Sequence, residues 1–203
     1  MDNVLRRRLL AGFAATALAP LAGVAWAAPQ RVIFEGQAFD LRVTVAGAEL
    51  RLNGTGVRQV AWFKGYLCAL YLGSPADSAA QALAMAGPKR IHLRMLQEVP
   101  AAEFSKAMRK GIVRNSTPPV QQALAARVDR FSAQIDAIGK VRAKDVVDLD
   151  LDPARGLLMS LNGALRGDPV PGEDFYAALL RSFVGEVPYD TRMRAGLLGR
   201  PAG

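Results

Sequence analysis

The segment from residue 53 to residue 73 decides the fold, and its sequence is NGTGVRQVAWFKGYLCALYLG. It begins with a predicted glycine turn, continues as an apolar run rich in aromatic residues, and ends at a glycine. Such a run predicts a pair of β-strands or one long bent strand. Both faces are apolar, which indicates a central strand covered on both sides. One predicted face carries Val60, Trp62, Tyr66, Cys68, Leu70 and Leu72, and the other carries Ala61, Phe63, Leu67, Ala69 and Tyr71.

Arg58 lies where the predicted turn meets the buried strand, and Tyr66 lies further along that strand. A guanidinium in such a place is costly unless an anion meets it. The anion is either a bound ligand or an internal acidic residue such as Glu173 or Asp174. The sequence leaves both explanations open.

The composition indicates one globular domain and excludes several kinds of site. The chain has 203 residues, of which 51% are hydrophobic and 22% are charged. Cys68 is the only cysteine and lies in the apolar strand, so we expect a buried, inert thiol. His92 is the only histidine, which rules out multi-histidine metal sites, and no nucleophile-elbow motif is present. We therefore expect no metal and no other cofactor.

The first 27 residues have the pattern of a secretory signal peptide. Arg6-Arg-Arg8 is a basic segment, Leu9–Val24 is apolar, and Ala25-Trp-Ala27 forms a cleavage site of small residues. We predict cleavage near Ala27, export to the periplasm, and a mature domain over residues 28–203. Adjacent arginines are also typical of twin-arginine signals, although no Ser or Thr precedes them. The alternative is an uncleaved anchor, and after cleavage we expect no stable membrane span.

The net charge is +8, or +6 once the predicted signal peptide is removed, and this limits the partners of an exported protein. The basic residues are spread along the chain and do not form one block. Nucleic acid is not expected as a partner outside the cytoplasm. An anionic small molecule or a membrane surface fits this charge and compartment better.

The remaining patterns predict an α+β fold with a largely antiparallel sheet and helices packed on one face. Period-two alternation marks strands over residues 37–45, 48–53, 89–99, 145–152 and 156–163, and consecutive strands come in hairpins. Helical periodicity and capping residues mark helices over residues 76–86, 100–114, 120–138, 174–184 and 190–198. We expect solvated faces at Arg90, His92 and Arg94 and at Asp148, Asp150 and Asp152. The alternative for Arg94 is a place in an anion pocket.

In the order and spacing of its motifs, the sequence resembles the bacterial exported branch of the chalcone isomerase-like family. The resemblance covers roughly residues 39–199. It rests on the turn Gly54-Thr-Gly-Val-Arg58, the strands at 66–72 and 87–98, and the ending Asp174-Phe, Gly185-Glu-Val-Pro and Leu197-Leu-Gly199. The implied fold is an open-faced β-sandwich, in which a large antiparallel sheet is covered by a helical layer that forms a cleft.

The resemblance also implies a chemistry. Plant members of the family cyclise a chalcone to a flavanone, and an arginine holds the anionic substrate; Arg58 matches that arginine. The other catalytic positions differ. A threonine is replaced by Tyr66, a tyrosine by Phe104 and an asparagine by Gly111, while a polar Thr or Ser of the late helix falls at Tyr176.

A second branch of the fold binds fatty acids without catalysis, with an arginine and a tyrosine on the carboxylate. Arg58 and Tyr66 fit that pairing, and the loss of polar groups at Phe104 and Gly111 suits an acyl tail. We therefore expect a periplasmic protein that binds a small amphipathic anion, either a fatty acid or a phenolic compound. Its cleft would be headed by Arg58 and lined by Tyr66, Phe104 and Tyr176.

Two alternatives remain. The first is an isomerase, an intramolecular lyase acting on a chalcone-like enone, in which Arg58 stabilises the enolate. The second is a protein-interaction module that keeps the fold and has no ligand.

Overall fold

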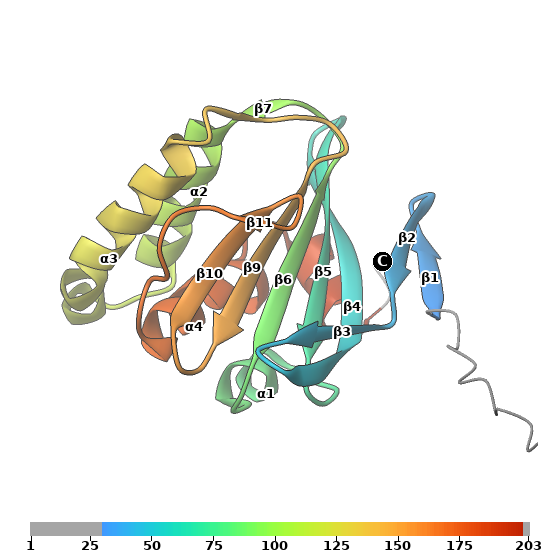
Figure 1. Ribbon diagram of the computed structural model, residues 1–203, viewed down its shortest axis with the longest axis horizontal. Coiled ribbons are helices and arrows are strands. Elements are labelled where there is room, and N and C mark those ends of the chain that lie inside the picture. The colour runs from blue at the N-terminus through green and yellow to red at the C-terminus, as the bar shows by residue number, and fades with distance from the viewer. Residues whose placement is uncertain (1–29, 201–203) are drawn as a thin grey trace, which may run out of the picture.

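The computed structural model describes residues 30–200, and the predicted signal peptide lies outside this range. A seven-stranded antiparallel sheet forms the centre of the fold (Figure 1), with the strand order β11-β10-β9-β6-β5-β4-β3. Its strands are β3 (Arg42–Val45), β4 (Ala48–Val60), β5 (Phe63–Leu72), β6 (Lys89–Met95), β9 (Val146–Asp152), β10 (Gly156–Leu161) and β11 (Ala164–Leu165).

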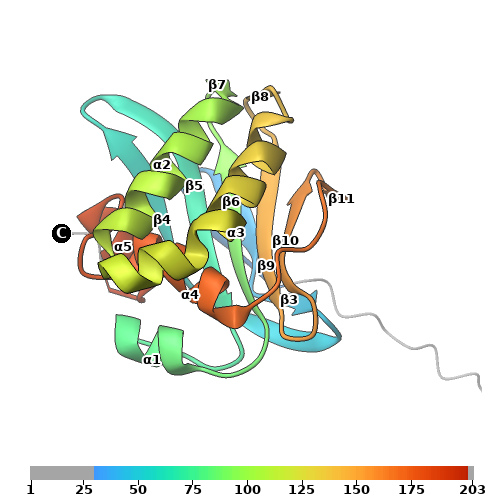
Figure 2. The ribbon, with the colours of Figure 1, turned by 90° about the vertical axis from the view of Figure 1, so that its left-hand side faces the viewer.

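Helices cover one face of this sheet, as predicted. Figure 2 shows α2, α3 and α4 in front of the strands, with α1 below them. The helices are α1 (Ala79–Ala84), α2 (Ala101–Arg114), α3 (Pro118–Asp136), α4 (Glu173–Val184) and α5 (Thr191–Leu197). Two further strand pairs complete the fold: β1 (Arg31–Phe34) with β2 (Gln37–Asp40), and β7 (Val99–Pro100) with β8 (Lys140–Val141). Among residues 30–200 no helix is both long and apolar enough to cross a bilayer.

Strand β5 is central and buried on both faces, which confirms the prediction from its sequence. Cys68 and Leu70 belong to the core between sheet and helices, and Leu67 and Ala69 belong to a second core on the other face. All four are fully buried. Burial also raises the pKa of the Cys68 thiol, as expected for an inert core cysteine.

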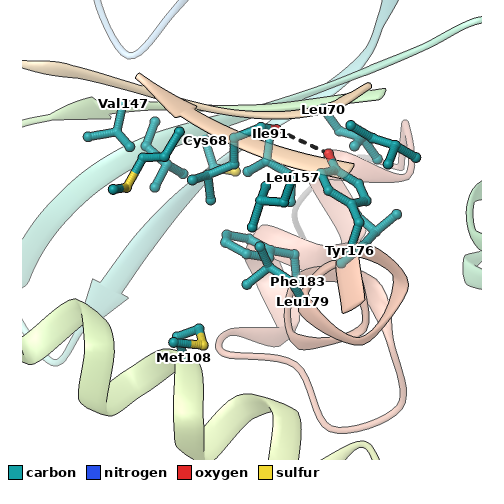
Figure 3. Packing of buried hydrophobic residues seen from close by; sticks show 14 of the residues in the cluster. Cys68, Leu70, Ile91, Met108, Val147, Leu157, Tyr176, Leu179 and Phe183 are labelled. Atoms are coloured by element: carbon teal, nitrogen blue, oxygen red, sulfur yellow. Dashed lines mark hydrogen bonds between the residues drawn. The ribbon is translucent and has the colours of Figure 1, made fainter. Parts of the chain in front are cut away.

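The main core lies between the sheet and the helical layer. Figure 3 shows Leu179 and Phe183 of α4 beneath the strands, with Met108 of α2 further along the same layer. Tyr176 of α4 is also part of this core, and its hydroxyl donates a hydrogen bond to the carbonyl oxygen of Leu149 at 3.2 Å. A buried hydroxyl satisfied in this way holds α4 against β9.

The predicted glycine turn at residues 54–58 is wrong, because this segment is part of the continuous strand β4. The glycines serve close packing against α5. A Cβ placed on Gly54 would lie 2.1 Å from the carbonyl oxygen of Gly196, and one on Gly56 would lie 2.7 Å from that of Met193. The chain turns instead after Val60, where Ala61 has a φ of 52°. Trp62 is therefore at a hairpin tip and is 89% exposed, not buried in a strand.

The predicted solvated faces of β6 and β9 are also wrong, because their charges pair across the sheet. Arg90 lies opposite Asp150 and His92 lies opposite Asp148. The Arg90 guanidinium binds the Asp150 carboxylate through two hydrogen bonds of 2.6 Å, and His92 Nδ1 lies 2.7 Å from Asp148 Oδ1. These side chains are less than one fifth exposed. Complementary stripes on neighbouring strands thus form a half-buried ionic layer.

Two smaller differences concern the N-terminal strands. The predicted strand over residues 37–45 is divided into β2 and β3, and β2 pairs with β1, which the sequence patterns did not indicate. This β1–β2 hairpin stands beside the sheet (Figure 1). Its Phe39 packs into the second core, which it helps to cover.

Candidate ligand-binding cleft

Arg58 and Tyr66 are directly opposite each other on β4 and β5, so the hairpin itself brings the two predicted site residues together. The Arg58 side chain is 30% exposed. Its Nη1 atom lies 3.6 Å from Asp190 Oδ2, which is long for an ion pair with hydrogen-bond character. The guanidinium therefore keeps much of its hydrogen-bonding capacity for another anion.

The predicted internal partners of Arg58, Glu173 or Asp174, are wrong. Asp174 is bound by Arg127 through two hydrogen bonds of 2.6 Å. The acidic neighbour of Arg58 is Asp190, the N-cap of α5, whose Oδ1 accepts hydrogen bonds from the backbone N–H groups of Arg192 and Met193. Capping already engages this carboxylate, so it is only a partial partner for Arg58.

A cleft of about 420 Å³ opens beside this pair, and we call it the mouth. Its walls come from the β4–β5 hairpin, the segment around β7, the start of α2, and Tyr189. The charged side chains that line the mouth are one arginine, Arg58, and two glutamates, Glu98 and Glu103. Glu98 is already paired with Lys140 at 2.9 Å. The mouth thus offers a cationic group beside apolar walls made by Val60, Phe63 and Phe104.

A second space of about 70 Å³ continues from the mouth into the core between the sheet and helices α2, α3 and α4, and we call it the inner cavity. Tyr66, Phe104, Ala107 and Tyr189 line both spaces, so the two meet at these residues. The remaining walls of the inner cavity are apolar: Leu93, Met108, Phe131, Ile135, Ile138, Val141, Val147, Leu149, Met159, Leu179 and Phe183.

Tyr66 stands at the junction of the two spaces. Its ring centroid is 6.0 Å from that of Phe104, and its side chain is almost fully buried. Burial is the main cause that raises the pKa of its hydroxyl, with the neighbouring Cys68 and Tyr189 adding to it. The hydroxyl therefore stays protonated near neutral pH and can donate a hydrogen bond to a carboxylate.

Tyr189 also stands at this junction, and the sequence analysis missed it. Its ring packs edge-to-face on Phe183 with 5.0 Å between centroids, and burial raises the pKa of its hydroxyl to about 12. A Cβ placed on Gly111 would lie 2.7 Å from the Tyr189 ring. Ser182 and Tyr189 together fill the space beside Gly111, because the Ser182 Oγ atom would lie 2.5 Å from the same Cβ. Nothing local in the sequence signals this, because the contact joins α2 to the segment before α5.

Two other candidates lie elsewhere. Tyr176 lines neither the mouth nor the inner cavity; it borders a separate small pocket with Lys89 and Glu173. Arg94, considered for an anion pocket, faces the opposite side of the sheet, where its guanidinium carbon lies 5.8 Å from the ring centroid of Phe39. Phe104, by contrast, lines both spaces of the cleft as an apolar wall.

Residues 32–199 match the model of the family described as chalcone isomerase-like. The chain belongs to the chalcone isomerase-like family. This confirms the resemblance found in the sequence, and the antiparallel sheet with its helical layer confirms the predicted fold class. No match was found among curated proteins.

Among solved structures, this chalcone isomerase-like chain is similar to a fatty-acid binding protein from Arabidopsis thaliana. The TM-score is 0.63 at 15% sequence identity, and the match covers 83% of this chain and 96% of the plant protein. At that identity the likeness concerns the fold.

Proposed function

We propose that this protein binds a fatty acid or a closely related amphipathic carboxylate in the cleft. The carboxylate lies in the mouth against Arg58, next to the junction that Tyr66 and Tyr189 line. The acyl tail runs past Phe104 and Ala107 towards the inner cavity. The observation that carries the proposal is that one cleft joins a mouth containing the Arg58 guanidinium to an inner cavity whose walls are apolar apart from the two tyrosines at the junction.

The energetics favour a ligand with a long apolar tail. Each methylene moved from water into apolar surroundings stabilises the complex by about 0.8 kcal/mol. The carboxylate then has only to be oriented, and a planar guanidinium with fixed donors suits that task. The inner cavity of about 70 Å³ is smaller than a long tail, so the tail occupies the mouth as well and displaces flexible walls such as Met108.

The fold relationship supports the proposal, since the similar plant structure is named a fatty-acid binding protein. The isomerase alternative draws less support from the cleft. Of the polar groups that the family's catalysis uses, Arg58 is kept, whereas Phe104 and Gly111 stand at positions that are polar in the catalytic members. Export to the periplasm is also part of the proposal and rests on the signal-peptide pattern.

Two assays separate the alternatives. Mass spectrometry of purified protein under native and then denaturing conditions should reveal a co-purifying fatty acid. A delipidated sample should rebind laurate with one molecule per chain, and absence of both would refute the proposal. For the isomerase, a chalcone absorbance band should disappear faster with protein than without it, and should do so only when Arg58 is intact; we expect equal rates.

A further inference from the structure

The tip of the β4–β5 hairpin is an exposed apolar patch. Val60, Trp62 and Phe63 are 55%, 89% and 38% exposed, and they fall within four consecutive residues. Single exposed apolar residues are common on protein surfaces, but three side chains gathered at a protruding tip are not. Figure 2 shows the β4–β5 hairpin projecting to one side of α2, at the upper left, away from the rest of the sheet.

This tip is also the rim of the cleft. Val60 and Phe63 line the mouth together with Arg58, whereas Trp62 does not line it. The left-handed backbone of Ala61 makes the tight turn that places Trp62 at the end of the hairpin. Whatever surface covers the indole therefore meets the entrance through which a ligand reaches Arg58.

The size and shape of the patch indicate what covers it. Large aromatic side chains bury about 150–250 Å² each, so three side chains supply a few hundred Å². A stable protein partner or a second copy of the chain needs about 800 Å² on each side and a complementary surface. A lipid bilayer needs neither, and tryptophan is enriched at the level of its headgroups. The chain without the predicted signal peptide carries a net charge of +6, which favours a bilayer with anionic headgroups.

We propose that the hairpin tip inserts into the surface of an anionic lipid bilayer and so turns the mouth of the cleft towards the lipid. Docking itself is independent of the ligand. The consequence that the acyl ligand passes directly between bilayer and cleft rests on the proposed function above. An apolar rim suits this passage, because the tail leaves the hydrocarbon without crossing water.

The sequence supplies a probe for the test. Trp62 and Trp26 are the two tryptophans, and Trp26 lies before the predicted cleavage site. The chain from Ala28 onward contains every helix and strand that the structure describes over residues 30–200. Its tryptophan emission therefore reports Trp62 alone. Addition of vesicles made of phosphatidylcholine and phosphatidylglycerol should shift this emission to the blue, and cosedimentation should show binding that is weaker with pure phosphatidylcholine.

Trp62→Ser should weaken cosedimentation by about tenfold or more, since it removes the largest apolar side chain of the tip. The matched control is Leu165→Ser, which removes an apolar side chain that is 59% exposed on β11 and should leave vesicle binding unchanged. Equal vesicle binding by the wild type and Trp62→Ser would overturn the proposal. So would failure of the wild type to bind vesicles, or a blue shift that grows with protein concentration without lipid, which would indicate a second copy as the partner.

A second measurement separates docking from ligand binding. Trp62→Ser should bind laurate from solution as the wild type does, but should remove labelled fatty acid from vesicles several-fold more slowly. If both chains bind laurate and remove it from vesicles at the same rate, docking is refuted and the proposed function stands. If neither binds laurate while the wild type still binds vesicles, the proposed function fails and docking stands.

Discussion

Replacing Arg58 by glutamine should weaken fatty-acid binding by about 5- to 30-fold. A hydrogen bond to a charged group contributes about 1.5–3 kcal/mol when it is well shielded. The Arg58 side chain is 30% exposed and already faces Asp190 at 3.6 Å, so we reduce this to about 1–2 kcal/mol. Since about 1.4 kcal/mol corresponds to a factor of ten in the dissociation constant, a loss of about 1–2 kcal/mol weakens binding by about 5- to 30-fold.

Titration calorimetry with laurate and with dodecanol isolates this contribution. The alcohol keeps the tail and lacks the charge, so Arg58→Gln should barely change its affinity. Arg51→Gln is the matched control, because Arg51 is an exposed arginine on the same strand and does not line the cleft. Equal losses for acid and alcohol would show that the substitution damages the cleft, and an unchanged laurate affinity would refute the placement of the carboxylate.

Three further predictions follow from the contacts around the cleft and the helical layer. Ala107→Phe should fill the junction between the mouth and the inner cavity and weaken laurate binding at least tenfold, as measured by calorimetry. Ala102→Phe on the same helix should leave the laurate affinity unchanged, because Ala102 does not line the cleft. Similar laurate affinities for the two variants would place the acyl tail elsewhere. Asp190→Asn should keep the N-cap of α5 but remove the negative charge that competes with a ligand for Arg58. We therefore expect laurate to bind about two- to fivefold more tightly, with an unchanged melting temperature, and weaker binding would contradict this. The hydrogen bonds from Arg127 lower the pKa of Asp174, so this pair stabilises the fold fully above the ordinary carboxyl pKa of about 3.9, and the contribution is lost as the pH falls through the lowered pKa. Asp174→Asn should therefore lower the free energy of unfolding, measured in urea, by about 0.5–1 kcal/mol at pH 7 and by nothing in strong acid. A loss that does not depend on pH would refute the ionic origin.

The sequence predicted most of the fold, because periodicity reports which face of each element is buried. The five helices appear where their apolar periodicity and capping residues placed them, with ends that move by a few residues. The face assignment of β5 is also correct from Tyr66 onwards. These features depend on local patterns, which a single sequence displays.

The errors arise where a contact between distant segments decides the local structure. Gly54 and Gly56 have the appearance of a turn, but they are small because α5 packs on β4. Asp148 and Asp150 have the appearance of a wet face, but Arg90 and His92 on the neighbouring strand pair with them. In each case the partner lies far along the chain, and only the folded sheet brings the two together.

The candidate site was predictable in part for the same reason. Arg58 and Tyr66 are close in sequence and meet across one hairpin, so a strand prediction places them together. Tyr189 reaches the junction of the cleft from the segment before α5, and no pattern in the sequence indicates that. Tyr176 was expected in the cleft through its alignment with the late helix, whereas its hydroxyl is held by the Leu149 carbonyl.

Calorimetry of the delipidated chain with saturated fatty acids from octanoate to palmitate tests the central claim most directly. If the tail lies in the apolar part of the cleft, affinity should rise by up to about fourfold for each added methylene until the cleft is filled, with one ligand per chain. The heat-capacity change on binding should be negative. An affinity that does not depend on tail length, or no binding of any member of the series, would contradict the account.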